Sequence, residues 1–365
     1  MTPDRALLGR ILDAPFHRLF RTAGRPVTAP LEISFALTYK CANRCRTCGS
    51  ITKAAGPESA AEEYKEIFRR IPFSPLAVTF TGGEPFLRED LTEIAVAACE
   101  SLRPAFVFIE TCADLPELIS GAAHTLADSF PDTCFVVKLP MDGVQERMDW
   151  MRGGARGAFE LFLRSFRTLK AGGAGNLATV LSVLVSRFNQ DSAAILLREA
   201  FMLYPDAVSL EFAGRMEALA APETAAPDRE KALALPSLYR KLARENTPSR
   251  GIPRLLTNLY LRRAAASAAA LAGAGRRPRC FAGFSSLYID PSGSVMDCPG
   301  AARELGLLKD NDYSLERLLD SDRAAEARRR IARSACACPM SRGPVLSNAL
   351  LTPRGAISLA VSVLF

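Results

Sequence analysis

The side chains best suited to chemistry in this sequence are three cysteines in the segment ISFALTYKCANRCRTCGS. Cys41, Cys45 and Cys48 follow a short apolar run with the spacing C-x3-C-x2-C. Three thiolates this close together can hold three irons of a four-iron cluster, which leaves the fourth iron free to bind a substrate or a cofactor. Zinc sites more often contain paired C-x2-C spacings, and a loop this polar does not suit three unrelated buried cysteines.

A second polar turn follows about one strand and one helix later, in LAVTFTGGEPFLRED. Gly82, Gly83, Glu84 and Pro85 come directly after an apolar run. Two glycines allow the backbone to approach a ligand closely, and the glutamate offers an acceptor to an ammonium group. The sequence therefore predicts a ligand contact at this turn.

A second set of cysteines lies later in the sequence. Cys280 and Cys298 flank a β-hairpin pattern, in which an alternating SSLYID run is followed by a PSG turn. Cys336 and Cys338 follow a stretch rich in leucine and arginine. Four cysteines in this order suit one complete cluster held by four thiolates, [4Fe–4S] in type, and a structural zinc site with the same ligands is the alternative.

Apolar strands and helical stretches alternate between these motifs. Strands are expected over 31–37, 76–81, 105–111, 133–139, 177–185 and 206–213, and helices over 89–103, 157–171 and 191–203. Strands separated by helices of this length predict right-handed βαβ crossovers and a parallel sheet. Ligands of barrel-like α/β folds bind at the carboxyl ends of the strands, and both polar turns fall there.

The cysteine spacing and the GGE turn, each behind a strand, resemble the signature of the radical S-adenosylmethionine (radical SAM) enzymes. The resemblance implies an α/β fold, an open (βα)6 partial TIM-type barrel. It implies a [4Fe–4S] cluster on Cys41, Cys45 and Cys48, with S-adenosyl-L-methionine on its open iron. It also implies that the GGE segment contacts the methionine amino group. The residue before the third cysteine, usually aromatic in this family, is Thr47 here.

Two further segments resemble the family more loosely. After the fourth strand, LPMDGVQERMDWMRGG matches a family segment at Asp142 and Arg152, which are expected near the mouth of the active site. An Asp-Gly turn with a helix cap is the alternative for this segment. Thr111 and Cys112 stand where the family often has Thr-Asn-Gly, so Thr111 is a candidate hydrogen-bond donor to the cofactor.

The later cysteines resemble the auxiliary-cluster extensions of radical SAM enzymes that are known as SPASM and twitch domains. The stretch from Cys280 to Cys298 has the spacing C-x12-G-x4-C, which fits the opening of that pattern. The full SPASM form needs more cysteines than this part of the chain offers. A small, cysteine-rich, twitch-like C-terminal domain with a second auxiliary [4Fe–4S] cluster is therefore expected.

The motifs divide the chain into five expected regions. These are an N-terminal amphipathic helix (1–30), the radical SAM partial barrel (31–215), a helical connector (216–279), the auxiliary-cluster domain (280–340) and a C-terminal tail (341–365). The first region is expected to pack on its own domain, with peripheral membrane contact as the alternative. The alanine-rich connector is interpreted as scaffolding.

Composition narrows the class of protein. The chain has 365 residues, 48% of them hydrophobic and 23% charged, which is typical of a globular protein. The net charge of +7 comes from scattered arginines without interleaved aromatic residues, which favours a solvated basic face over nucleic-acid binding. Ten cysteines without an export signal indicate a reducing compartment, and a cytoplasmic location is expected.

The resemblance implies that one electron from an external flavodoxin- or ferredoxin-type donor cleaves the cofactor, and that the resulting 5′-deoxyadenosyl radical takes hydrogen from an unreactive carbon. A closed auxiliary cluster would accept the substrate's electron, giving a dehydrogenation or a cross-link. Only about 30 residues precede the first strand, too few for an N-terminal peptide-recognition domain. The expected substrate is therefore a small molecule, or a peptide brought by a partner. The alternatives are a peptide maturase with a separate recognition partner and a non-catalytic iron–sulfur or zinc protein, and no catalytic acid or base is assigned.

Overall fold

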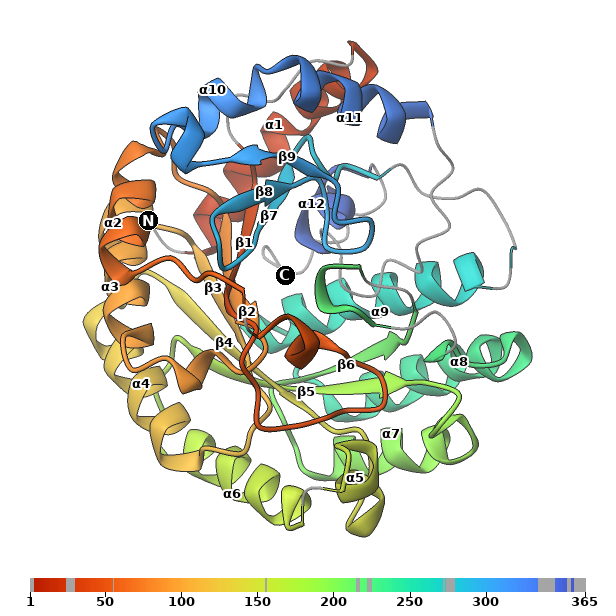
Figure 1. The fold of residues 1–365 in the computed structure, drawn as a ribbon. Coiled ribbons are helices and arrows are strands. Elements are labelled where there is room, and N and C mark those ends of the chain that lie inside the picture. Colours follow the sequence, from red (N-terminus) through yellow and green to blue (C-terminus); the bar gives the residue numbers. More distant parts are fainter. Residues whose placement is uncertain are drawn as a thin grey trace.

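The computed structural model of the chain describes residues 3–357, except 24–29, 55, 155, 215–216, 222–224, 272, 274–279, 334–344 and 353–355. Two cysteines of the predicted auxiliary site, Cys336 and Cys338, lie outside the described residues. The main element is a nine-stranded sheet with the order β6-β5-β4-β3-β2-β1-β7-β8-β9. It curls into an open barrel with helices on its outside (Figure 1).

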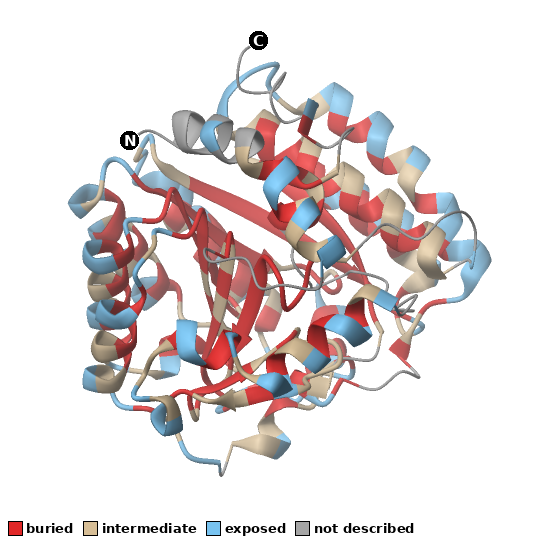
Figure 2. Ribbon diagram, turned by 90° about the horizontal axis from the view of Figure 1, so that it is seen from above, coloured by how far each residue is buried: buried red, intermediate tan, exposed pale blue. Residues whose placement is uncertain are grey.

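Six parallel strands form the larger part of the sheet, and each lies within one residue of its predicted bounds. They are β1 (Glu32–Thr38), β2 (Ala77–Gly82), β3 (Phe106–Glu110), β4 (Cys134–Pro140), β5 (Leu177–Val185) and β6 (Ala207–Phe212). Every neighbouring pair among them is parallel. Because helices cover one face and the barrel interior covers the other, the strands are buried along most of their length (Figure 2). The predicted partial barrel is confirmed.

The outer helices present an apolar stripe to the sheet. They are α2 (Ala61–Arg70), α3 (Leu91–Leu102), α4 (Pro116–Ser129), α6 (Ala158–Ala171) and α7 (Ala193–Met202), with the short α5 (Glu146–Met151) after β4. In α2, Glu63 accepts a hydrogen bond from the backbone N–H of Ala60 at 3.1 Å and so caps the helix. One turn on, Phe68 packs edge-on against Phe35 of β1 with ring centroids 5.2 Å apart. Such contacts fix the helices on the barrel.

Two long helices follow the sixth strand. These are α8 (Arg229–Asn246) and α9 (Gly251–Leu271), and α9 packs against β6 and against α12 (Val345–Leu350). The inward face of α9 is not uniformly apolar, since Tyr260 and Arg263 are both buried. This part of the chain was interpreted as scaffolding, yet α9 contributes these two side chains to the barrel interior.

The C-terminal strands extend the barrel sheet past β1. Strand β7 (Ser286–Ile289) pairs with β1 in parallel, and β8 (Ser294–Met296) and β9 (Glu304–Leu307) add to it antiparallel. The predicted hairpin is therefore present between β7 and β8. Its turn is held by Asp290, whose side chain accepts from the N–H groups of Ser292 and Ser294 at 2.9 and 3.0 Å. Helices α10 (Leu315–Leu319) and α11 (Asp322–Arg333) follow.

The N-terminal helix α1 (Pro3–Ala23) docks on this C-terminal part of the molecule. The ring of His17 is hydrogen-bonded through Nδ1 to Ser285 Oγ at 2.8 Å, and Arg21 Nε donates to the backbone oxygen of Cys280 at 2.7 Å. The helix thereby fixes the backbone just before β7.

Two apolar side chains of α1 point away from the protein. Phe16 is 62% exposed and Leu19 is 65% exposed, although both belong to the predicted apolar face. Among the described side chains of α1, Ala14 packs against Leu31, Phe281 and Leu351, and His17 makes a polar contact. None of the described helices combines the length and the apolar character that crossing a membrane requires.

Candidate active site

A cavity of about 130 Å³ lies where the barrel strands end. Its walls come from the loop after β1, the turn after β2, the ends of β3 and β4, and residues of β5 and β6. The residues predicted from the sequence that line it are Cys41, Cys45, Cys48, Gly82, Gly83, Thr111 and Asp142. Residues from four separate segments thus face one cavity, since the carboxyl ends of parallel strands meet at one edge of a sheet.

The cysteine loop is held in place by its backbone. The N–H groups of Arg44 and Arg46 donate to the carbonyl oxygens of Arg152 and Met151 at 3.2 and 2.9 Å, which ties the loop to the end of α5. The Arg46 guanidinium also stacks on Trp150, 3.7 Å from the ring centroid. These contacts keep the thiols turned towards the cavity.

The turn after β2 requires both of its glycines. Gly82 has a φ of 139°, and a Cβ there would lie 2.1 Å from the backbone oxygen of Thr38. A Cβ on Gly83 would lie 2.1 Å from the oxygen of Lys40. The backbone N–H groups of Gly83 and Glu84 donate to those same two oxygens, at 2.7 and 2.8 Å. The glycines therefore allow the turn to pass directly against the start of the cysteine loop.

Glu84 points away from the cavity towards the end of β3. It is 1% exposed, and its carboxylate accepts from Phe86 N at 3.0 Å, from Thr111 Oγ1 at 2.9 Å and from the N–H of Cys112. Burial raises the pKa of this carboxyl. Its side chain and the Thr111 hydroxyl are thus bonded to each other, and their predicted roles as cofactor contacts stay predictions.

One thiol of the predicted cluster set touches a cysteine outside it. The Sγ atoms of Cys41 and Cys112 are 3.6 Å apart. This contact lowers the pKa of Cys41 and, together with burial, raises the pKa of Cys112. Burial raises the pKa of Cys45 to about 12, so a metal's charge is needed there to make it a thiolate.

Asp142 and Arg152 lie beside one another beneath the cysteine loop. Arg152 is 2% exposed, and its Nε lies 4.0 Å from Asp142 Oδ2. Its Nη2 donates to the oxygen of Pro140 at 3.0 Å, whereas Nη1 is buried without a hydrogen-bond partner among the described residues. Further along this segment, Asp149 accepts from the backbone N–H groups of Gly157 and Ala158 at the start of α6, at 3.0 and 2.9 Å.

Below the first cavity, the barrel interior contains a network of buried charges. Lys138 lies between two carboxylates, those of Glu110 at 3.1 Å and of Glu211. Arg263 of α9 reaches Glu211 from the other side at 3.4 Å. Thr81 donates to Glu110 at 3.1 Å. The sequence analysis did not identify these side chains. Three of them, Glu110, Lys138 and Glu211, are charged residues in otherwise apolar strands, which is a signal that could have found them.

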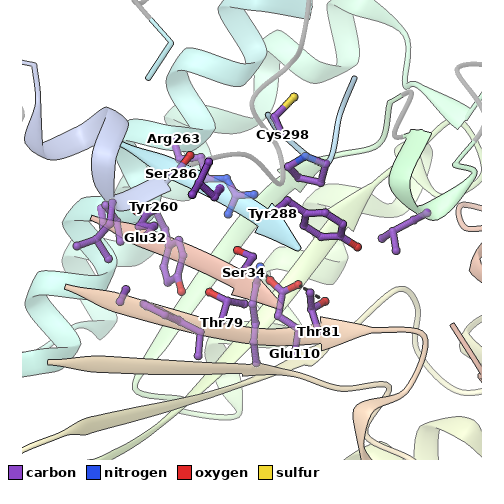
Figure 3. A pocket seen from close by; sticks show the side chains of 18 residues that line it. Glu32, Ser34, Thr79, Thr81, Glu110, Tyr260, Arg263, Ser286, Tyr288 and Cys298 are labelled. Atoms are coloured by element: carbon purple, nitrogen blue, oxygen red, sulfur yellow. Dashed lines mark hydrogen bonds and ion pairs between the residues drawn. The ribbon is translucent and has the colours of Figure 1, made fainter. Parts of the chain in front are cut away.

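A second cavity of about 90 Å³ extends into this network (Figure 3). It shares Thr81, Glu110, Lys138 and Leu219 with the first cavity, so the two meet at the charged network. Cys298 stands at its wall, and the ring of Tyr288 borders it. The barrel interior thus connects the cysteine loop with one cysteine of the predicted auxiliary site.

Glu32 occupies another part of this second cavity. Its carboxylate accepts from the backbone N–H of Ser347 in α12 at 2.7 Å. Burial raises its pKa to about 7, with the backbone bonds and the charge of Arg263 acting in the opposite direction. Glu32 is therefore placed to change its charge near neutral pH, which its position at the start of an apolar strand did not predict.

Cys280 and Cys298 are the two described cysteines of the predicted auxiliary site, and they are close enough for one to raise the pKa of the other. Both thiols accept N–H groups, Cys280 from Ala282 at 3.5 Å and Cys298 from Ala301 at 3.3 Å. Burial raises the pKa of Cys298 to about 12, and Cys280 is among the groups that contribute. Such N–H donors tune a cluster's reduction potential where the sulfurs ligate one.

Comparison with known proteins agrees with this arrangement. Residues 35–200 match the family model of the Radical SAM superfamily. The chain is similar to the mycofactocin maturase MftC of Mycolicibacterium smegmatis, with 28% identity over 180 residues, 48% of this chain and 43% of that protein. For MftC of Mycobacterium tuberculosis, the identity is 26% over 181 residues, 49% of this chain and 44% of that protein. The matched region spans less than half the length of these relatives.

Solved structures share the fold. Streptococcus suis SuiB bound to precursor peptide SuiA superimposes with a TM-score of 0.60 at 15% identity, covering 86% of this chain and 70% of SuiB. The structure of anSMEcpe with bound AdoMet superimposes with a TM-score of 0.57 at 16% identity, covering 81% of this chain and 79% of that chain. The family match, with the cysteine loop and the GGE turn inside it, identifies residues 35–200 as a radical SAM domain.

Proposed function

We propose that this protein is a radical SAM enzyme that modifies a peptide oxidatively, with the reacting residue inside the barrel between two metal sites. The observation that carries the proposal is the pair of joined cavities. One is lined by Cys41, Cys45 and Cys48, and the other by Cys298. When bound, a [4Fe–4S] cluster with S-adenosyl-L-methionine supplies a radical that removes a hydrogen atom from carbon.

The residues of the first cavity fit this cofactor. Three thiols face a space that Gly82 and Gly83 also line, and these glycines let the turn lie directly against the start of the cysteine loop. Arg152 lies outside this lining, but its Nε is 4.0 Å from the lining residue Asp142 and its buried Nη1 lacks a partner among the described residues. A guanidinium donor there suits a carboxylate such as that of the cofactor's methionine. In this proposal the chain orients the cofactor and excludes water from the reacting atoms.

The residues of the second cavity hold the substrate in this proposal. Lys138, Glu110 and Thr81 face both cavities and are positioned to bind polar groups of a substrate at the boundary. Glu32 can take up or release a proton near pH 7. Cys280 and Cys298, with Cys336 and Cys338, would hold the auxiliary cluster that accepts an electron from the substrate, and zinc remains the alternative at that site.

A peptide substrate is supported by the relatives. Both curated relatives are named as maturases, and SuiB was solved with a precursor peptide. A separate partner delivers the peptide in this proposal, and a flavodoxin- or ferredoxin-type protein donates the electron. A small polar molecule is the second candidate, favoured by the charged, hydroxyl-rich lining of the second cavity.

Two variants test this division of labour. Cys41→Ala should abolish the formation of 5′-deoxyadenosine from S-adenosyl-L-methionine and dithionite under anaerobic conditions. Cys298→Ala should retain that activity and lose turnover of the substrate. Equal loss of cofactor cleavage in both variants would contradict the proposal, and no cleavage by the wild type would favour a non-catalytic binding protein. About eight irons per chain are expected for two clusters, and about four if zinc occupies the auxiliary site.

A further inference from the structure

The thiol of Cys112 has no role in the proposed chemistry, yet it lies against a predicted cluster ligand. Its Sγ is 3.6 Å from that of Cys41, and both side chains are partly exposed in the first cavity. Cys41 follows β1 and Cys112 follows β3, and these two strands are not neighbours because β2 lies between them. The thiols therefore meet across the end of β2.

The turn after β2 makes this meeting possible. Its backbone is bonded to the start of the cysteine loop, through Gly83 to Thr38 at 2.7 Å and through Glu84 to Lys40 at 2.8 Å. The side chain of Glu84 is bonded to the end of β3, through the N–H of Cys112. One short segment thus joins the loop that carries Cys41 to the loop that carries Cys112.

A second link lies on the far side of the thiols. Asn43 Nδ2 donates to Asp114 Oδ2 at 2.7 Å, which joins the same two loops two residues beyond each cysteine. The two loops are therefore joined on both sides of the thiols, which holds the backbones of Cys41 and Cys112 near each other. A disulfide has an S–S length of about 2.05 Å, so closing the bond needs an approach of roughly 1.5 Å, within the range of side-chain rotation.

We propose that Cys41 and Cys112 form a reversible disulfide in the cluster-free protein, which blocks cluster assembly until it is reduced. The oxidant is a low-molecular-weight disulfide. One thiolate attacks it and releases one small thiol, and the second thiol then attacks the mixed disulfide and releases the other. One protein S–S bond forms, the small disulfide is reduced to two thiols, and these receive the two protons.

The consequence follows from ligand chemistry. A sulfur in a disulfide is not a thiolate and cannot ligate iron, so one of the three predicted ligands is withdrawn. Oxidation beyond the disulfide is also prevented, because the sulfur does not reach the irreversible sulfinic state. The disulfide itself needs only the two thiols, whereas its effect on the cluster rests on the proposed function.

The bond is mapped on metal-free protein after exposure to 2-hydroxyethyl disulfide. Trypsin releases Cys41 in the peptide CANR, which contains no other cysteine. The peptide of residues 89–138 contains Cys99, Cys112 and Cys134, so fragmentation of the linked peptide in the mass spectrometer identifies the partner. Linkage of CANR to the peptide that contains Cys112 is the expected result, and it should be lost in Cys112→Ser. Linkage of Cys41 mainly to Cys45 or Cys48 would overturn the proposal. Cys99→Ala, which changes a buried cysteine of α3, is the matched control and should retain the bond.

Iron uptake tests the consequence. The iron bound at the loop of Cys41 is measured after anaerobic reconstitution without a thiol reductant. In the wild type and in Cys99→Ala, prior oxidation should lower this amount about tenfold, and reduction of the disulfide should restore it. In Cys112→Ser, oxidation should leave iron uptake unchanged. An equal fall in Cys112→Ser would show that another oxidation blocks assembly. The mapping is read without iron, so its outcome does not depend on whether the proposed function is correct.

Discussion

The first cavity, called the upper one below, and the second, called the lower one, are formed by different kinds of secondary structure. The walls of the upper cavity come mainly from loops, and the residues that matter there stand close together in the sequence, as in Cys41, Cys45 and Cys48. The walls of the lower cavity come from strands and from α9, and its charges are far apart in the sequence, as in Glu32 and Arg263. Local spacing therefore encodes the first cavity, and topology assembles the second.

The two cavities also differ in the interactions that hold them together. The upper cavity depends on backbone approach, which only glycine permits at the turn after β2. The lower cavity depends on mutual compensation among buried charges, in which each group is tolerated because a partner is present. A substitution in the first should damage geometry, and a substitution in the second should damage stability.

Lys138→Met should have the largest effect on stability. It removes the cation between Glu110, which is partly exposed, and the buried Glu211, which keeps only Arg263 as a cationic partner, and this should cost about 3 kcal/mol of unfolding free energy. Urea denaturation measures the loss. The matched control is Arg164→Ala, which breaks an exposed ion pair and should cost less than about 1 kcal/mol. Similar losses in the two variants would mean that the network is not a compensated buried cluster.

Gly83→Ala should damage the upper cavity with less effect on the barrel. The added Cβ would lie 2.1 Å from the oxygen of Lys40, so the turn must move away from the cysteine loop. A displacement of this size should reduce 5′-deoxyadenosine formation about 100-fold. Gly121→Ala in α4, where a Cβ meets nothing within 4 Å, should leave that rate unchanged. Wild-type rates in Gly83→Ala would contradict the close approach.

Glu32→Gln should change how stability depends on pH. Because folding raises the pKa of Glu32 from 4.5 to about 7, the folded state loses stability as the pH rises between these values, and the loss is complete above the folded pKa. Glutamine carries no charge, so the variant should gain roughly 2 kcal/mol on the wild type at pH 8 and little at pH 4. Denaturant titrations at both pH values measure this. Parallel pH curves for both proteins would exclude the buried carboxyl as their cause.

Tyr288→Phe should have the smallest effect. The Tyr288 hydroxyl is buried next to that of Tyr39, and neither makes a hydrogen bond of good geometry among the described residues, so its removal should leave the unfolding free energy unchanged or raise it by up to about 1 kcal/mol. Tyr239→Phe is the matched comparison, because that buried hydroxyl donates to the backbone oxygen of Val208 and its loss should be destabilising. Equal destabilisation by both changes would indicate that Tyr288 has a partner within the protein.

The sequence predicted the strands and the upper cavity well for a physical reason. Six apolar runs between helical stretches leave few alternatives to parallel βαβ units, and loops at their carboxyl ends must then converge. The contact of Cys41 with Cys112 was not predictable in this way, since it depends on how the turn of Gly83 and Glu84 crosses from one loop to the other.

The charged residues of the lower cavity were harder to predict from the sequence. Lys138 and Glu211 could have been noticed, since each is a charged residue within an apolar strand. Arg263 could not, because its role follows from the packing of α9 on β6. The exposure of Phe16 and Leu19 likewise depends on which face of α1 the C-terminal part of the chain accepts.

Strand β1 has a consequence for how the protein is made. It is among the first strands to leave the ribosome, yet β7, its neighbour on one side, is translated roughly 10–50 s later at typical synthesis rates. The hydrogen bond between Glu32 and Ser347 joins positions 315 residues apart in the sequence. During that interval the nascent chain carries an unpaired strand edge beside an uncovered acidic group, which is the part of the molecule most exposed to mispairing before release.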